Sequence, residues 1–231
     1  MSKFAIFDID GTVVDSRQII HQSMVLAFER ADLRPPDYDA TRQIVGLSLE
    51  IAIDRLAPPD IDHATLIELV EGYKQAYAEI RTKMGEYAPL YTGITEVLEH
   101  LRARNWEIGI ATGKSHKGLN KVIDGHELSH FFDCRFCADD GPSKPDPFMV
   151  DANLKAMSRA PHDAIMIGDT SFDMLMGQAA GVATLAVDWG FHTRDELAAC
   201  TPDIIVSTMA ALKDALDMFE QGQGWAKGCA A

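Results

Sequence analysis

Two kinds of hydrophobic pattern alternate along the chain. Short apolar or β-branched runs, typical of buried strands, are separated by segments whose apolar residues recur every three to four positions, which indicates amphipathic helices. Regular alternation of strand and helix predicts an α/β fold, a parallel sheet with helices on both faces. The predicted strands are residues 3–8, 106–112, 134–139, 164–169, 183–188 and 203–207, with helices such as 93–105 and 171–181 between them.

The alternation is interrupted once, directly after the first predicted strand. Residues 16–86 carry helical periodicity without a strand pattern, and proline-containing breaks at 35–36 and 58–59 divide them. This pattern predicts an inserted helical domain. We therefore expect a sheet domain at 1–15 and 87–221, a helical domain at 16–86 and a flexible tail at 222–231.

Composition excludes several classes of partner. A formal net charge of -14 and a pI near 4.9 oppose binding to nucleic acid or to an anionic membrane. Four scattered cysteines fit a reducing compartment, and we expect a cytoplasmic protein because no apolar run is long enough to span a bilayer. Cys134 and Cys137 form a C-x-x-C without a second Cys or His pair at ligand spacing, which favours structural cysteines over a metal site.

Polar side chains gather where the predicted strands end. Because the carboxyl ends of parallel strands open on one edge of a sheet, these side chains are expected to meet there. Four carboxylates in one place require a cation, and an all-oxygen ligand set suits Mg²⁺. The residues concerned are Asp8, Asp10, Thr112, Lys144, Asp169 and Asp173.

This set of groups matches the needs of phosphoryl transfer. One Asp carboxylate can attack phosphorus, and a second can protonate the leaving group and then deprotonate water, so Asp8 and Asp10 supply both roles. Each remaining group also has a structural explanation: an N-cap for Thr112, a solvated loop for Lys144, and helix first-turn acids for the last two aspartates. Their joint placement favours a site.

Four short motifs carry a family resemblance. The segments "DIDGTVVDS", "ATGKS", "SKPDP" and "IGDTSFD" resemble, in order and spacing, the four motifs of the haloacid dehalogenase superfamily. The helical insertion resembles the cap of its phosphoglycolate phosphatase-like and β-phosphoglucomutase-like branch. The resemblance implies a Rossmann-like core with a mobile cap, hydrolysis of a small phosphorylated metabolite with Mg²⁺, and a monomer or homodimer. The cap is expected to hinge near residues 14–18 and 84–92.

The resemblance also implies a role for each motif residue. Asp8 is the expected nucleophile, Asp10 the general acid and base, and Thr112 and Lys144 the phosphate binders. The expected metal ligands are Asp8, Asp10 through its backbone carbonyl, Asp169, and Asp173 as a supporting carboxylate. Expected substrate contacts are Gly11, Thr12, Gly113 and Lys114 in the core and Gly46 and Ser48 in the cap.

Single residues distinguish this chain from members of the same superfamily that catalyse other reactions. Dehalogenases and phosphonatases lack the second aspartate, so Asp10 opposes both. Mutases keep that aspartate, but mutase-like members place a cation where this chain has Leu49, and Arg42 or Arg55 would have to replace it. Hydrolysis, with phosphoglycolate as the default substrate, is therefore favoured over a mutase. A non-catalytic phosphate-binding protein remains a third alternative.

Overall fold

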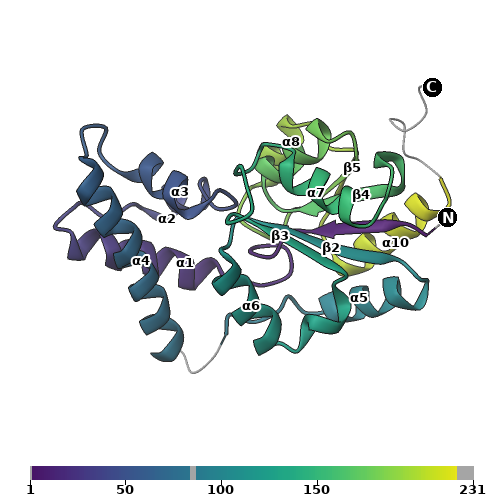
Figure 1. Cartoon of the computed structure of the whole chain (residues 1–231), viewed down its shortest axis with the longest axis horizontal. Coiled ribbons are helices and arrows are strands. Elements are labelled where there is room, and N and C mark those ends of the chain that lie inside the picture. The colour runs from purple at the N-terminus through teal and green to yellow at the C-terminus, as the bar shows by residue number, and fades with distance from the viewer. Residues whose placement is uncertain (1, 84–86, 223–231) are drawn as a thin grey trace.

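The computed structural model describes residues 2–83 and 87–222. They form a six-stranded, all-parallel sheet with the strand order β3-β2-β1-β4-β5-β6 (Figure 1). The six predicted strands and the α/β class are confirmed, with the strands slightly shorter than predicted. They are β1 (Phe4–Phe7), β2 (Glu107–Thr112), β3 (Cys134–Cys137), β4 (Ala164–Gly168), β5 (Ala183–Val187) and β6 (Ile204–Val206).

Alternate residues of the central strand β1 reach two different layers of the core. Phe4 and Ile6 pack with residues of α7 (Phe148–Ala156) and α8 (Ser171–Ala179). Ala5 and Phe7 pack on the opposite face, with residues of α5 (Ile94–Ala103), α6 (His116–Gly125) and α10 (Met209–Glu220). Burial on both faces explains the nearly continuous apolar run of β1. The next residue, Asp8, is the first polar side chain after Lys3 and comes directly after the end of β1.

Four helices between β1 and α5 form a separate lobe beside the sheet (Figure 1). They are α1 (Arg17–Arg30), α2 (Tyr38–Arg42), α3 (Leu49–Leu56) and α4 (His63–Lys83). Helices α1 and α3 both pack on α4, and α2 packs on α1, whereas α5 packs on β2 and α10 and belongs to the sheet layers. This lobe is the predicted helical insertion, and it is called the cap below.

The outgoing and returning chain segments pair where the cap meets the sheet domain. The amide of Asp15 donates to the carbonyl of Pro89 at 2.8 Å, and the amide of Tyr91 donates to the carbonyl of Val13 at 3.0 Å. A hinge at this point therefore involves both segments together. Gly85 of the predicted second crossing lies outside the described residues, as do residues 223–231 of the predicted tail.

The remaining helices are short connections between strands. They are α9 (Arg194–Ala199) and the 3₁₀ turns η1 (Leu128–Phe131) and η2 (Pro161–Asp163). No helix in the described ranges has both the length and the apolar character that crossing a membrane requires.

Candidate active site

A buried ion cluster lies at the carboxyl ends of β1 and β4. Lys144 places its Nζ atom 2.7 Å from Oδ1 of Asp8 and 2.7 Å from Oδ1 of Asp173. Asp8, Asp169 and Asp173 each contribute a carboxylate oxygen within 4.8 Å of the others. All four side chains are at most 1% exposed. The structure thus brings together four of the predicted site residues, and Lys144 is not a solvated loop lysine.

Two donors and two glycines hold Asp169 in place. Thr12 donates its hydroxyl to Oδ1 at 2.8 Å, and the backbone N–H of Phe191 donates to Oδ2 at 2.8 Å. A Cβ atom on Gly11, whose φ is +86°, or on Gly190 would lie 2.1 Å from Oδ2. Both positions therefore need glycine for the backbone to approach this carboxylate.

Asp173 combines a helix-capping role with its place in the cluster. Thr170 is the N-cap of α8, and its hydroxyl and amide donate to Oδ2 of Asp173 at 2.7 and 3.0 Å. This reciprocal capping box leaves Oδ1 facing Lys144. Asp173 therefore caps α8 through one oxygen and pairs with Lys144 through the other.

Burial and mutual repulsion raise the pKa of two of these carboxyl groups, Asp8 and Asp169. Burial, with Asp173 beside it and against the attraction of Lys144, raises the pKa of Asp8 to about 7. Burial and the neighbouring Asp8 and Asp173 raise the pKa of Asp169 well above its usual value. Burial alone would lower the pKa of Lys144, but the two carboxylates beside it outweigh that effect and raise it. The cluster therefore has an unmet need for positive charge.

The donor set fits a hard divalent cation. Oδ2 of Asp8 is buried and accepts no hydrogen bond from the described residues. Three carboxylates without a nitrogen or sulfur donor are the ligands that Mg²⁺ prefers. A cation bound by these carboxylates would relieve the repulsion among the aspartates.

Asp10 lies beside the cluster rather than in it. Its Oδ2 is 2.8 Å from Nζ of Lys114, and its Oδ1 is buried without a hydrogen-bond donor among the described residues. The carboxylate is thus turned away from the acidic group, so a metal contact by Asp10 would have to use its backbone carbonyl.

Thr112 is buried at the end of β2 and does not cap the helix that follows. Its hydroxyl oxygen accepts the backbone N–H of Lys114 at 3.3 Å. The N-cap of α6 is Ser115 instead, which accepts from Gly118 at 3.2 Å. The N-cap interpretation of Thr112 is therefore wrong, and the residue is available for a ligand at the sheet edge.

The α2–α3 loop of the cap lies directly over this edge. Gly46, with φ at +103°, sits against Thr170, whose hydroxyl would be 3.1 Å from an added Cβ. Gly113 faces the carbonyls of Gly46 and Leu47, and the amide of Ser48 donates to Oγ of Ser143 at 2.8 Å. The predicted cap contacts, Gly46 and Ser48, therefore meet the sheet domain at the site.

Side chains of the cap make a second layer of contacts. Arg42 bridges to Glu196 of the sheet domain at 2.7 Å and to Asp39 at 2.9 Å. The guanidinium of Arg55 lies 5.6 Å from the ring centre of Phe172. Both arginines that were candidates to replace a cation at Leu49 thus have partners in the sheet domain.

The helix α4 reaches the site through an aromatic ring. Tyr77 lies with its ring centre 5.5 Å from Nζ of Lys114, and the Tyr73 ring is next to it, 6.1 Å away centre to centre. Burial raises the pKa of Tyr73 well above its usual value, and the charge of Asp10 adds to this effect. The side of the site opposite the acidic cluster is therefore aromatic and belongs to the cap.

Sequence reasoning missed several residues that shape the site. Thr170 carried a readable signal, since T-x-x-D before an apolar run is the capping-box pattern. Gly190, three residues after the end of β5, signals a close backbone approach. The amide of Phe191 and the hydroxyl of Ser143 act through tertiary placement alone, which no local pattern encodes.

Comparison with known proteins gives the family. The family model described as haloacid dehalogenase-like hydrolase matches residues 5–187. The protein named "Probable phosphatase IndB" from Dickeya dadantii is 32% identical, over 91% of each chain. Pyrophosphatase PpaX from Bacillus cereus is 27% identical, over 90% of this chain and 93% of its own.

A β-phosphoglucomutase from Clostridium difficile shares the fold, with a TM-score of 0.80 at 17% identity over 96% of this chain and 99% of its own. The helical insertion after the first strand is thus shared with a solved structure of the branch that the motifs resemble. On the family match and the sequence identity, the chain belongs to the haloacid dehalogenase-like hydrolases.

Proposed function

We propose that this protein is a Mg²⁺-dependent phosphatase that hydrolyses a small phosphate monoester through an aspartyl-phosphate on Asp8. The observation that carries the proposal is the setting of Asp8. One oxygen is held by Lys144 at 2.7 Å, while the other is buried and accepts no hydrogen bond from the described residues. A carboxylate fixed in this way presents one oxygen for in-line attack.

The first half-reaction forms one P–O bond and breaks another. The free oxygen of Asp8 bonds to phosphorus as the bond to the leaving oxygen breaks, and Asp10 gives that oxygen a proton. Lys144 and Thr112 hold the phosphoryl oxygens as negative charge develops on them. Lys114 keeps the Asp10 carboxylate at the sheet edge through its 2.8 Å contact.

The second half-reaction regenerates Asp8. Asp10, now ionised, takes a proton from a water molecule whose oxygen attacks phosphorus, and the bond between phosphorus and Asp8 breaks to release phosphate. Asp8, Asp169 and the backbone carbonyl of Asp10 would hold Mg²⁺, with Asp173 in support. The ion, when bound, neutralises charge on the phosphoryl group and on the carboxylates.

The cap, proposed as residues 16–86 on a core of 1–15 and 87–221, supplies the leaving-group side of the site. Its α2–α3 loop and Tyr77 approach the same edge as Asp10. Closing the cap excludes water while Asp8 is phosphorylated, and opening it admits water and releases the product.

Hydrolysis is favoured over phosphoryl transfer to a sugar. A mutase must hold a second phosphate in the cap, and Leu49 offers no charge for it. Arg42 and Arg55, the two candidates to replace that charge, are engaged with Glu196 and Phe172. Among small monoesters, phosphoglycolate is the first choice of substrate, and the relative named as a pyrophosphatase adds pyrophosphate to the set to be tested.

The test is phosphate release from a panel of compounds with Mg²⁺ or with EDTA. The panel contains phosphoglycolate, pyrophosphate and β-glucose 1-phosphate. Asp8→Asn keeps an oxygen for Lys144 and is expected to lower kcat at least about a thousandfold. The matched control is Asp163→Asn, a buried aspartate that pairs with Lys3 beside the start of β4 and is expected to leave kcat unchanged.

Each alternative function has its own result. Isomerisation of β-glucose 1-phosphate in the presence of glucose 1,6-bisphosphate would identify a mutase. Thermal stabilisation by phosphate compounds without phosphate release would identify a binding protein. Release that needs neither Mg²⁺ nor Asp8 would contradict the proposed mechanism.

A further inference from the structure

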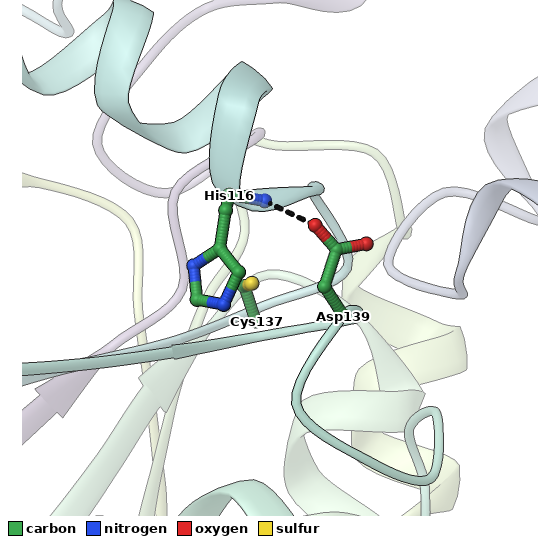
Figure 2. A group of neighbouring side chains, drawn as sticks. All are labelled: His116, Cys137 and Asp139. Carbon is green, nitrogen blue, oxygen red and sulfur yellow. Dashed lines mark hydrogen bonds between the residues drawn. The ribbon is translucent and has the colours of Figure 1, made fainter.

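A second cluster of potential metal ligands lies just beyond the ends of β2 and β3. His116, Cys137 and Asp139 each offer a donor atom, and these atoms lie within 4.8 Å of one another. Figure 2 shows the His116 ring beside the Cys137 sulfur, with the Asp139 carboxylate on the neighbouring loop. Cys137 is buried, while His116 and Asp139 are exposed. The cluster is therefore open to solvent on one side.

The sheet register brings these residues together. Thr112 of β2 is the direct partner of Cys137 in β3, so the segments that follow the two strands run side by side. The amide of Ala138 donates to the carbonyl of Lys114 at 3.0 Å. A cysteine and a histidine that are 21 positions apart in the chain thus become neighbours. The C-x-x-C with Cys134 plays no part, because Cys134 contacts Asn153 instead.

Two carboxylates hold the donors in place without help from a ligand. Asp139 accepts the backbone N–H of His116 at 2.7 Å through one oxygen, as the dashed line in Figure 2 shows. Asp140 accepts the backbone N–H of Cys137 at 2.8 Å and contacts Nε2 of His116 at 3.0 Å. Because Asp140 occupies Nε2, an ion bound by His116 would have to use Nδ1 or displace Asp140. The two carboxylates fix the backbone positions of His116 and Cys137 before any ion binds.

We propose that His116, Cys137 and Asp139 form a binding site for one Zn²⁺ or a similar d-block cation. One thiolate, one imidazole nitrogen and one carboxylate oxygen are a borderline-soft set that prefers Zn²⁺ or Co²⁺ to Mg²⁺. Three protein ligands with a fourth position open to water suit tetrahedral zinc. This donor chemistry distinguishes the site from the all-oxygen cluster at Asp8, Asp169 and Asp173.

Metal binding here requires a proton to leave. Burial, reinforced by the neighbouring Asp140, raises the pKa of the Cys137 thiol to about 12, so the thiol is protonated in the metal-free protein. A thiol must lose its proton to bind the ion, so binding is expected to release a proton and to strengthen as the pH rises. The bound ion would link the residues after β3 to the start of α6, next to the Thr112–Lys114 segment of the active site.

Co²⁺ is the probe for this site, in protein already saturated with Mg²⁺. We expect one equivalent to produce the near-ultraviolet absorption of a thiolate–Co²⁺ bond, and Zn²⁺ to abolish it by displacement. Cys137→Ser should remove the absorption. Cys134→Ser, on the same strand, is the matched control and should retain it. An all-oxygen site cannot produce this band, so the readout is independent of the phosphatase proposal.

Two further variants test the other ligands. His116→Gln and Asp139→Asn alter exposed side chains, so the fold should be kept, and each is expected to weaken Co²⁺ binding at least about tenfold. The absence of a thiolate band in the wild-type protein at pH 8 with excess Co²⁺ would overturn the proposal. A band that survives Cys137→Ser would overturn it as well, because another thiol would then be the ligand.

Discussion

Gly113 of the sheet domain lies against the backbone carbonyl of Gly46 in the cap. A Cβ atom on Gly113 would lie 2.6 Å from that oxygen and 2.6 Å from the carbonyl oxygen of Leu47. Both obstacles are backbone atoms, which cannot rotate away as a flexible side chain can. The missing side chain of Gly113 is therefore a condition for this close contact between the cap and the sheet domain.

Gly113→Ala is expected to oppose cap closure without unfolding the protein. The added methyl group clashes only when the cap is closed, so we expect KM to rise and kcat to fall while the melting temperature stays within a few degrees of the wild-type value. Steady-state kinetics and thermal unfolding measure the two effects separately.

Gly118→Ala in α6 is the matched control for this variant. Its Cβ would meet only ordinary contacts, at 3.4 Å from Oγ of Ser115 and 3.8 Å from Cβ of Lys114. Its kinetics should stay close to wild type. Unchanged kinetics in Gly113→Ala would show that the enzyme does not need this closed contact.

A second prediction concerns the ion pair that joins the cap to the sheet domain. Arg42 holds Glu196 at 2.7 Å, and its hydrogen bond lowers the pKa of Glu196 to about 2. Arg42→Gln and Glu196→Gln should each raise KM several-fold, because the cap loses an attachment to α9, the helix that follows the segment whose Phe191 amide holds Asp169. The coupling free energy in the double-mutant cycle should be about 0.2–1 kcal/mol, as for other partly exposed pairs.

The control for this pair lies within the cap. Arg30 and Glu79 pair at 2.8 Å between α1 and α4, without touching the sheet domain. Arg30→Gln removes a comparable ion pair and should leave KM unchanged. An equal rise of KM in Arg30→Gln and Arg42→Gln would point to general loosening of the cap instead.

A third prediction concerns Lys144 as a structural cation. Lys144→Met removes the positive charge shared by Asp8 and Asp173, so it should lower the free energy of unfolding in EDTA by about 3–5 kcal/mol. Adding Asp173→Asn should recover part of this loss, because one of the two uncompensated charges is then absent. Urea denaturation of the single and double variants measures the coupling.

Lys3→Met provides the comparison for Lys144→Met. Lys3 also pairs with a buried aspartate, Asp163, at 3.0 Å, but the Lys3 side chain is 19% exposed, whereas that of Lys144 is fully buried. Losing the Lys3–Asp163 ion pair should lower the free energy of unfolding by less than about 1 kcal/mol. Similar decreases in the free energy of unfolding for the two lysine variants would mean that burial does not determine how much Lys144 contributes to stability.

The sheet and the ion cluster could be predicted from the sequence because local patterns encode both. The apolar run before Asp8 sets the end of β1, and a parallel sheet brings the ends of all its strands to one edge. Asp8, Lys144, Asp169 and Asp173 then meet whatever the exact loop conformations are.

The contacts between domains could not be predicted in the same way. The partner of Arg42 is Glu196, in a helix far along the chain, and the partner of Asp10 is Lys114 rather than a group in the acidic cluster. Such pairs depend on the docking of the cap and on side-chain rotamers, which hydrophobic periodicity does not specify. The neighbouring positions of His116 and Cys137 depend likewise on the β2–β3 register.

The last prediction concerns the pH dependence of stability in the metal-free protein. The pKa of Asp8 is raised to about 7, chiefly by burial, so between about pH 4 and pH 7 the folded state keeps a proton that the unfolded state has lost. Because the folded state then binds more protons, this carboxyl makes the free energy of unfolding fall as the pH rises through that window.

Asp8→Asn should make the slope of unfolding free energy against pH less negative, and Asp163→Asn should not. Mg²⁺ should also make the slope less negative, because a bound cation stabilises the ionised carboxylate. Urea denaturation at several pH values, with EDTA or with Mg²⁺, measures these slopes. Equal slopes in Asp8→Asn and wild type would contradict the prediction, because Asp8 would then ionise in the folded protein as readily as in the unfolded chain.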